Sequence, residues 1–300
     1  MKQDLTARRF LRPEEVARIQ DLSLRARLIV EGFLVGLHRS PYHGFSVEFK
    51  EYREYTPGDD PRWVDWKAYA RSDRFFVKRF EEETNLRAYL LLDVSGSMDY
   101  PEGAHNKFAY AVNLAAALAY LFHLQRDATG LLAFNGGIVE HRTPRTSRLH
   151  LHQLFTLLAR LRPQGLSAPE RPLRMLTEYL KKRSLVILLS DLMTQPDPLL
   201  KALSFLRQRK HEVIVFHLLA PEEMHLSGEG PAVYRDLETG ERLAFDPRTY
   251  GRDYQERLHR FLERLRWDLR ARNVDYQLVN THEPFDRALL FYLKKRERLP

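Results

Sequence analysis

The sequence contains no cysteine in its 300 residues. Disulfide bridges and cysteine-ligated zinc sites are therefore excluded, and the absence agrees with a reducing compartment. No uninterrupted apolar run approaches the roughly 18 residues that a membrane span requires. The N-terminus, Met1–Arg12, is charged and lacks the apolar core of a signal peptide. We therefore expect a cytoplasmic protein without a transmembrane segment, in which any membrane contact would come through a partner or a surface patch.

The chain is basic, but its charges are mixed. It has 48 Lys and Arg against 40 Asp and Glu, which gives a net charge of +8 and a pI near 9.6. Basic proteins attract nucleic acid, anionic lipid or acidic proteins. Here acidic residues interrupt the basic ones along most of the chain, and no known nucleic-acid-binding module is visible. Nucleic-acid binding is therefore kept only as an alternative function.

The first quarter of the chain combines a helix with short strands. Apolar residues recur at three- and four-residue spacing across 13–37, which predicts an amphipathic helix. Residues 45–49 alternate apolar and polar side chains, and this segment and 74–80 are predicted strands. The sequence Pro-Gly-Asp-Asp at 57–60 predicts a turn. We expect residues 1–85 to form a helix-plus-β subdomain.

From residue 87 onward, predicted strands alternate with predicted helices. Strands are expected at 88–92, 129–134, 185–189, 213–218 and 274–279, and helices at 107–125, 149–161, 173–181, 199–208, 254–270 and 285–295. A β-hairpin turning at Thr239-Gly240 is expected as an insertion near 231–246. Alternating strands and helices predict a parallel sheet covered on both faces. The expected fold of residues 86–300 is therefore α/β, with a doubly wound, mostly parallel, Rossmann-like sheet.

Oxygen-bearing side chains follow two of the predicted buried strands. The first strand runs into Asp93-Val94-Ser95-Gly96-Ser97, and the strand at 185–189 runs into Ser190-Asp191. Ligands of such sheets bind at the carboxyl ends of the strands. Carboxylates and hydroxyls form a hard, oxygen-only donor set, which suits Mg2+, with Mn2+ or Ca2+ as alternatives. The expected ligands are Asp93, Ser95, Ser97, Asp191 and, from a loop between the two strands, Ser167.

A structural role is the alternative for part of this pattern. Asp and Ser often cap a helix that follows a strand, so the string at 93–97 alone is weak evidence for a metal. Two strand-end aspartates with a hydroxyl-bearing loop between them favour the cation site.

These residues resemble the metal-ion-dependent adhesion site of von Willebrand factor A domains. In that family the motif binds Mg2+ or Mn2+, and a carboxylate of a partner often completes the metal's ligand shell. The family normally has a threonine after Gly-Gly, whereas this chain has Gly165-Leu166-Ser167, which retains the hydroxyl. The resemblance covers about residues 86–295. It implies a metal-dependent adaptor that binds an Asp or Glu of a partner protein, rather than an enzyme.

A second resemblance lies in the N-terminal third. Residues 49–62, FKEYREYTPGDDPR, with segments at 64–66, 70–71 and 77–81, are similar to the signature of the DUF58 family. That family joins the signature to a metal-binding A domain, and its members are typically linked to MoxR-type AAA+ ATPases. The resemblance therefore implies a chaperone-like or assembly role with such an ATPase or its client. The signature is either a docking surface or a structural turn, and its candidate residues are Arg53, Asp59, Asp60, Arg62, Asp65, Trp66 and Arg71.

A metal-dependent phosphohydrolase is the remaining alternative, because a nucleophilic aspartate after a first parallel strand suits a phosphatase. Such sites usually have a second acidic residue two positions later as the acid/base. This chain has Ser95 there. The sequence also lacks Gly-x-Ser-x-Gly and Gly-x-x-x-x-Gly-Lys-Ser/Thr, against an α/β-hydrolase or a P-loop NTPase. We therefore expect no enzymatic activity.

Overall fold

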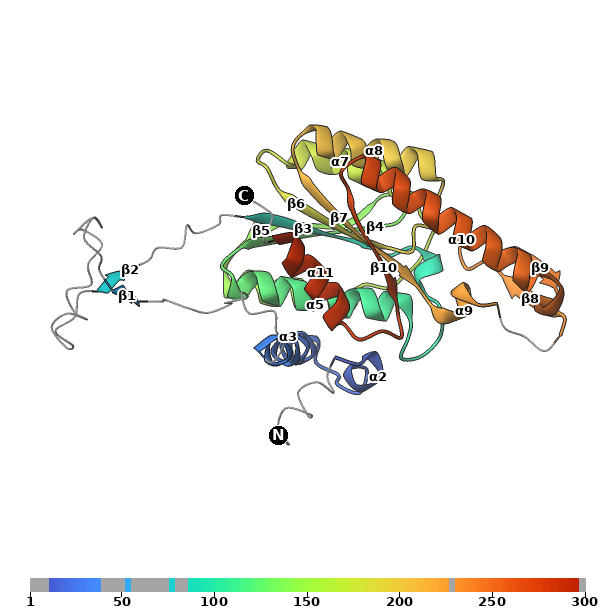
Figure 1. The fold of residues 1–300 in the computed structure, drawn as a ribbon, viewed down its shortest axis with the longest axis horizontal. Coiled ribbons are helices and arrows are strands. Elements are labelled where there is room, and N and C mark those ends of the chain that lie inside the picture. Colours follow the sequence, from blue (N-terminus) through green and yellow to red (C-terminus); the bar gives the residue numbers. More distant parts are fainter. Residues whose placement is uncertain (1–10, 39–51, 55–75, 79–85, 227–229, 297–300) are drawn as a thin grey trace.

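The computed structural model describes residues 11–38, 52–54, 76–78, 86–226 and 230–296. Its centre is a six-stranded sheet in the order β10-β7-β6-β3-β4-β5. Its strands are β3 (Arg87–Asp93), β4 (Ala128–Phe134), β5 (Ile138–Arg145), β6 (Leu185–Ser190), β7 (Glu212–Leu219) and β10 (Asp275–Asn280). All neighbouring strands pair in parallel except β4 and β5. With helices on both faces (Figure 1), the predicted doubly wound, mostly parallel α/β fold is confirmed.

The helices form a layer on each side of the sheet. One face carries α5 (Lys107–Leu124), α6 (Arg148–Arg160) and α11 (Asp286–Arg296), with α3 (Leu22–His38) packed outside α5. The other face carries α7 (Glu170–Tyr179), α8 (Pro196–Gln208) and α10 (Pro247–Ala271). These layers bury the central strands completely, which is why β3 and β6 have continuous apolar sequences.

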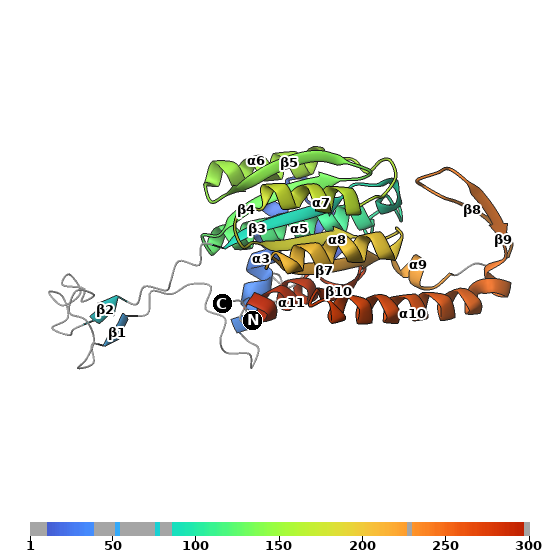
Figure 2. The ribbon, with the colours of Figure 1, turned by 90° about the horizontal axis from the view of Figure 1, so that it is seen from above.

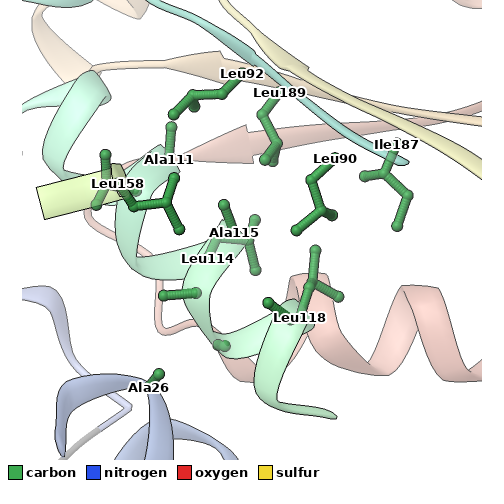
Figure 3. Close-up of a cluster of buried hydrophobic side chains, with 14 of the residues drawn as sticks. Ala26, Leu90, Leu92, Ala111, Leu114, Ala115, Leu118, Leu158, Ile187 and Leu189 are labelled. Carbon is green, nitrogen blue, oxygen red and sulfur yellow. The ribbon is translucent and has the colours of Figure 1, made fainter. Parts of the chain in front are cut away.

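Alternation along β3 and β6 divides the core into two halves. Leu90 and Leu92 of β3 point toward α5, together with Ile187 and Leu189 of β6 (Figure 3). The intervening side chains, such as Leu91, join the core on the opposite face. Successive strand residues point to opposite faces, and each fully buried leucine contributes roughly 1.5–3 kcal/mol. Both halves of the core therefore hold the strand ends of β3 and β6 in place.

Helix α5 is the one helix in the described residues that is long and apolar enough to cross a membrane by length and composition. Its 18 residues have a mean hydropathy of 1.3, and 78% of them are buried inside the structure. The sequence shows no uninterrupted apolar run of this length because Lys107, Asn113 and His123 interrupt it. In the structure the helix lies between the sheet and α3 (Figure 1), so its apolar composition matches a position in the core.

The predicted helix at 13–37 is divided into two helices. The first, α2, covers Pro13–Val16, and α3 starts anew at Leu22. Asp21 Oδ1 accepts a hydrogen bond from Leu24 N over 2.7 Å, as the cap residue of a helix does. Apolar spacing continues across this break, which is why the sequence predicted one helix. The buried residues of α3 belong to the same hydrophobic core as one face of the sheet. The division into two domains at residue 85 remains a prediction.

Two pairs of short antiparallel strands lie outside the central sheet. Strands β1 (Tyr52–Glu54) and β2 (Phe76–Lys78) pair antiparallel, and β2 lies inside the predicted strand at 74–80. The predicted strand at 45–49 lies outside the described residues. Strands β8 (Ala232–Arg235) and β9 (Arg242–Phe245) form the predicted hairpin. Figure 2 shows this hairpin rising from the start of α10 and curving back toward the sheet.

Candidate functional site

The two strands that end in predicted site residues are direct neighbours. Leu92 of β3 pairs with Leu189 of β6, so Asp93 and Ser190 end adjacent strands, and Asp191 follows at once. The chain leaves β3 for β4 on one side and later returns to β6 on the other. Ligands of doubly wound sheets bind at such a switch point, beyond the carboxyl ends of the strands. The predicted aspartates therefore lie together, at the place where this fold binds ligands.

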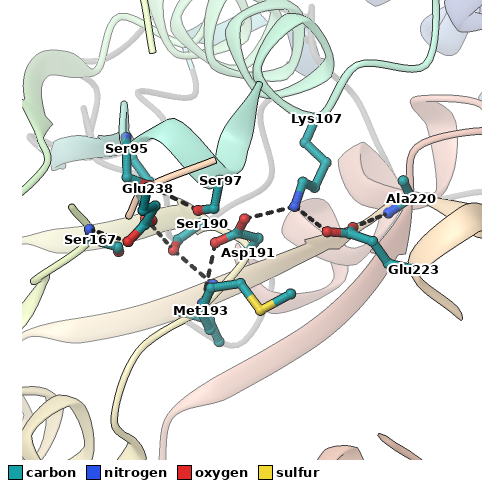
Figure 4. A network of polar contacts seen from close by, with 12 residues as sticks. Ser95, Ser97, Lys107, Ser167, Ser190, Asp191, Met193, Ala220, Glu223 and Glu238 are labelled. Atoms are coloured by element: carbon teal, nitrogen blue, oxygen red, sulfur yellow. Dashed lines mark hydrogen bonds and ion pairs between the residues drawn. The ribbon is translucent and has the colours of Figure 1, made fainter. Parts of the chain in front are cut away.

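Asp93 is fully buried, and serine hydroxyl groups contact its carboxylate. Figure 4 shows Ser95, Ser97, Ser167 and Ser190 gathered in this region. Asp93 Oδ1 accepts from Ser95 N at 2.9 Å. Its Oδ2 accepts from Ser190 Oγ at 2.6 Å and from Ser167 Oγ at 3.2 Å. The Oγ atoms of Ser95 and Ser97 lie 3.2 Å apart. Four of the five predicted ligands thus belong to one hydrogen-bonded cluster, which Ser190 joins from β6.

Backbone hydrogen bonds hold the loop of Ser167 against the turn after β3. Gly96 N donates to Gly165 O over 2.8 Å, and Gln164 N donates to Val94 O over 2.7 Å. Gly165 has a φ of +81°, a conformation that glycine adopts without strain. The loop is therefore fixed from both sides, which holds the Ser167 hydroxyl against the Asp93 carboxylate.

Asp191 is buried as well, but a lysine neutralises it. Lys107 Nζ, with a side chain only 1% exposed, lies 2.7 Å from Asp191 Oδ2 and 2.5 Å from Glu223 Oε1. Asp191 Oδ1 accepts from Met193 N over 3.2 Å. Glu223, in the short helix α9 (Pro221–Met224), also accepts from Ala220 N over 2.8 Å. Buried charges of this kind are stable only when they are paired, and the three side chains form such a network beside the Asp93 cluster.

The site carries an excess of negative charge. Burial, and then the negative charge of Asp191, raise the pKa of Asp93 to about 6. Burial lowers the pKa of His217 to about 4, so this histidine, whose Nε2 lies 2.9 Å from Asp191 O, is neutral at pH 7. Burial alone would lower the pKa of Lys107, but the carboxylates of Asp191 and Glu223 outweigh this effect and raise the pKa above its ordinary value. The ammonium group therefore stays charged. Lys107 is paired with Asp191 and Glu223, while the hydrogen bonds to Asp93 within the described residues come from neutral groups.

The donor set fits a divalent cation that keeps part of its water shell. No group of three or more Asp, Glu or His side chains forms a metal site by itself in the part of the chain that the structure describes. A cation here would instead combine the Asp93 carboxylate with the hydroxyls of Ser95, Ser97 and Ser167, and would contact Asp191 through water. Mg2+ is usually bound in this way, through one or two carboxylates and several waters.

Sequence reasoning missed four residues of this region. Lys107 starts a helix, where a lysine is usually exposed, and Ser190, although it precedes Asp191, is not among the expected ligands. Glu223 lies in a helix of four residues that no periodicity reveals. Glu238 comes from the turn between β8 and β9, and its Oε2 accepts from Ser167 N over 3.0 Å. These contacts join residues far apart in the chain, and only the fold shows them.

The residues of the N-terminal signature are placed only in part. Arg53 lies in β1, where it pairs with Val77 of β2. The other six candidates lie outside the described residues: Asp59, Asp60, Arg62, Asp65, Trp66 and Arg71. The role of the signature as a docking surface or as a structural turn therefore remains a prediction.

Comparisons with solved structures find a similar fold. An aerotolerance-related membrane protein from Bacteroides fragilis is 14% identical, with a TM-score of 0.51 and coverage of 71% of this chain and 100% of that one. The protein BatB from Bacteroides thetaiotaomicron is 16% identical, with a TM-score of 0.49 and the same coverage. At 14% identity, the likeness to the Bacteroides fragilis protein shows a similar fold and nothing more.

Sequence comparisons identify a relative and a protein family. The "Uncharacterized protein Rv1480" of Mycobacterium tuberculosis is 29% identical over 241 residues, which are 78% of this chain and 75% of that protein. The model of the family described as "Protein of unknown function DUF58" matches residues 51–261. This match includes the end of β3, the Ser167 loop, the end of β6 and the hairpin. Since it covers more than half of the chain and the whole candidate site, the protein belongs to the DUF58 family.

Proposed function

We propose that this chain is an adaptor that binds Mg2+ at the Asp93 cluster and uses the cation to hold an acidic residue of a partner protein. Mn2+ and Ca2+ are the alternative ions. One observation carries the proposal: Asp93 is a buried carboxylate whose hydrogen bonds all come from neutral groups within the described residues. A buried charge without a partner costs several kcal/mol. A cation at this position would offset that cost.

The charge balance explains why a partner carboxylate would bind. The Asp93 carboxylate supplies one negative charge to a dication, and Lys107 already neutralises much of Asp191. A cation held mainly by Asp93 and serine hydroxyls therefore keeps positive charge on its open side. An Asp or Glu of a partner would complete its ligand shell. Cation and partner then strengthen each other's binding by the same factor.

The surface around the site supports a protein as the partner. Leu166 and Met193 flank the site, in the Ser167 loop and after β6, and they are 56% and 49% exposed. Interfaces between proteins have apolar cores, and methionine is among the residues enriched there. Membership of the DUF58 family supports a protein-interaction role. We propose a MoxR-type AAA+ ATPase or its client as the partner, in a chaperone-like or assembly process.

The first experiment is a pull-down of a MoxR-type ATPase from the same organism, with Mg2+ and with EDTA. Wild type is compared with Asp93→Ala and with Asp253→Asn, which changes an exposed acidic residue of α10. We expect capture by wild type and the control variant in Mg2+ only, and none by Asp93→Ala. Capture that is equal in EDTA would refute the metal-dependent mechanism.

Fractionation of cells would test the proposed cytoplasmic location, with membrane association through the partner.

Two further measurements separate the alternatives. A turnover assay on generic phosphoesters with Mg2+ tests the phosphohydrolase, and activity lost in Asp93→Ala would replace the adaptor proposal. A nucleic-acid titration at two salt concentrations tests the basic surface, because phosphate contacts make affinity fall steeply with salt. We propose that the chain shows neither activity.

A further inference from the structure

The turn between β8 and β9 is preformed. Asp236 Oδ1 accepts from Glu238 N over 2.7 Å and from Thr239 N over 3.0 Å. Asp236 N in turn donates to Glu241 O over 2.8 Å. An aspartate that binds backbone amides two and three residues later fixes a turn locally. Glu238 is therefore presented in one orientation by the chain around it.

This turn lies directly over the candidate cation site. A Cβ atom added to Gly96 would come within 2.7 Å of Leu237 O, so only glycine permits this approach. Glu238 Oε2 accepts from Ser167 N over 3.0 Å. Figure 4 shows the Glu238 side chain on the same side of the cluster as Ser95 and Ser167. The hairpin thus brings one more carboxylate to the hydroxyl cluster.

The second oxygen of this carboxylate has no partner among the residues that the structure describes. Glu238 Oε1 is buried and has no hydrogen bond within the described residues. Leaving a charged acceptor buried and unpaired is costly. A glutamate at the tip of a surface hairpin could avoid this cost by turning its carboxylate outward into water. A cation bound by Asp93 and the serines would supply the missing partner of Oε1.

The hairpin is otherwise weakly attached. Val233 and Leu243 are each 66% exposed. At its base, Phe245 stacks on Tyr234 with centroids 4.1 Å apart and meets Tyr250 of α10 edge-on at 6.4 Å. The hairpin is therefore anchored at α10 and at the Glu238 tip, while much of its length faces solvent. Loss of the tip contact would release it.

We propose that Glu238 is an internal ligand of the cation site. Its carboxylate takes the coordination position that an Asp or Glu of a partner would take, so the hairpin must move before the partner binds. This inference rests on the proposed function, because it requires the same cation. It adds a built-in competitor: an acidic partner replaces an acidic residue of the chain itself.

The test compares the full chain with Glu238→Gln and with Glu241→Gln, a matched change in the same turn. Mn2+ serves as the probe, and its binding is measured by electron paramagnetic resonance. We expect Glu238→Gln to bind Mn2+ about tenfold more weakly, as the loss of a supporting carboxylate usually weakens metal sites by tenfold or more. Water-proton relaxation should show more exchangeable water on the bound Mn2+ in Glu238→Gln only.

Hydrogen exchange of residues 232–245 supplies the second readout. Adding Mn2+ should increase hairpin protection in wild type and in Glu241→Gln, and should leave it unchanged in Glu238→Gln. Acetate, as a small carboxylate probe, should displace water from Mn2+ at lower concentration in Glu238→Gln than in wild type. Together these results would establish the carboxylate as a ligand that competes with added carboxylates.

Failure of this inference and failure of the proposed function give different results. If wild type and both variants bind Mn2+ with the same affinity, hydration and hairpin protection, Glu238 is not a ligand and only the inference is overturned. If neither wild type nor Glu241→Gln binds Mn2+, the cation site itself is absent, and the proposed function is overturned with it.

Discussion

The hydroxyl of Ser190 donates a 2.6 Å hydrogen bond to Asp93 Oδ2 and so joins the ends of β3 and β6. The same Oγ accepts from Leu192 N over 3.0 Å. Ser190→Ala would remove a hydrogen bond to a carboxylate and leave a buried N–H unpaired. We expect a loss of about 2 kcal/mol in the free energy of unfolding. Urea unfolding checks this value. Ser204→Ala, which removes a hydroxyl bonded within α8, should cost less than about 0.5 kcal/mol.

The buried lysine predicts a large effect on stability. Lys107→Met would leave the carboxylates of Asp191 and Glu223 facing each other without a cation, so we expect a loss of about 3–5 kcal/mol. The double variant Lys107→Met, Glu223→Gln should recover part of this loss, because it removes one of the two uncompensated charges. Urea unfolding of both variants and of Glu223→Gln gives the coupling free energy. Additive effects in this cycle would contradict the ion-pair network.

His150 predicts a pH dependence of stability. Its Nε2 lies 2.8 Å from Thr129 O in the core. Burial lowers its pKa, and the charges of Arg145 and Arg142 lower it further. The unfolded chain, with an ordinary pKa near 6.5, then takes up a proton at higher pH than the folded chain. This contribution to stability is complete above about pH 6.5 and is lost as the pH falls toward the lowered folded value, by at most about 1.4 kcal/mol per pH unit.

The measurement is urea unfolding between pH 7.5 and 5.5. His150→Gln should reduce the slope of stability against pH. His152→Gln, at an exposed position of the same helix, should keep the slope of wild type. Equal slopes in all three proteins would show that His150 does not titrate differently on folding.

The sequence was sufficient to predict the sheet and the centre of the site for a physical reason. Strands that are buried on both faces must be continuously apolar, so β3 and β6 stood out, and each is followed at once by a carboxylate. Parallel pairing then requires both carboxyl ends to lie at one edge. The antiparallel strand β5 was missed because it is a half-exposed edge strand with charged residues and Pro144, which gives no apolar pattern.

The surroundings of the site could not be predicted in this way. Lys107 contacts Asp191 and Glu223 across 84 and 116 positions of the sequence, and Glu238 contacts Ser167 across 71. No local pattern encodes such contacts. A lysine at a helix start and a glutamate in a hairpin turn both indicate exposed residues by themselves, and the fold alone brings them to the site.

Gly96 gives a test of the hairpin position that needs no metal. Its Cβ position lies 2.7 Å from Leu237 O and 3.4 Å from Gly165 O. Both are backbone atoms that cannot rotate away, so Gly96→Ala should displace the turn of the hairpin. We expect faster hydrogen exchange in residues 232–245 and unchanged protection in β3 and β6, whose packing the new methyl group does not touch. Gly137→Ala is the matched control, because nothing lies within 4 Å of its Cβ position, and its exchange pattern should equal that of wild type. Unchanged hairpin protection in Gly96→Ala would mean that the turn does not rest on this glycine in solution.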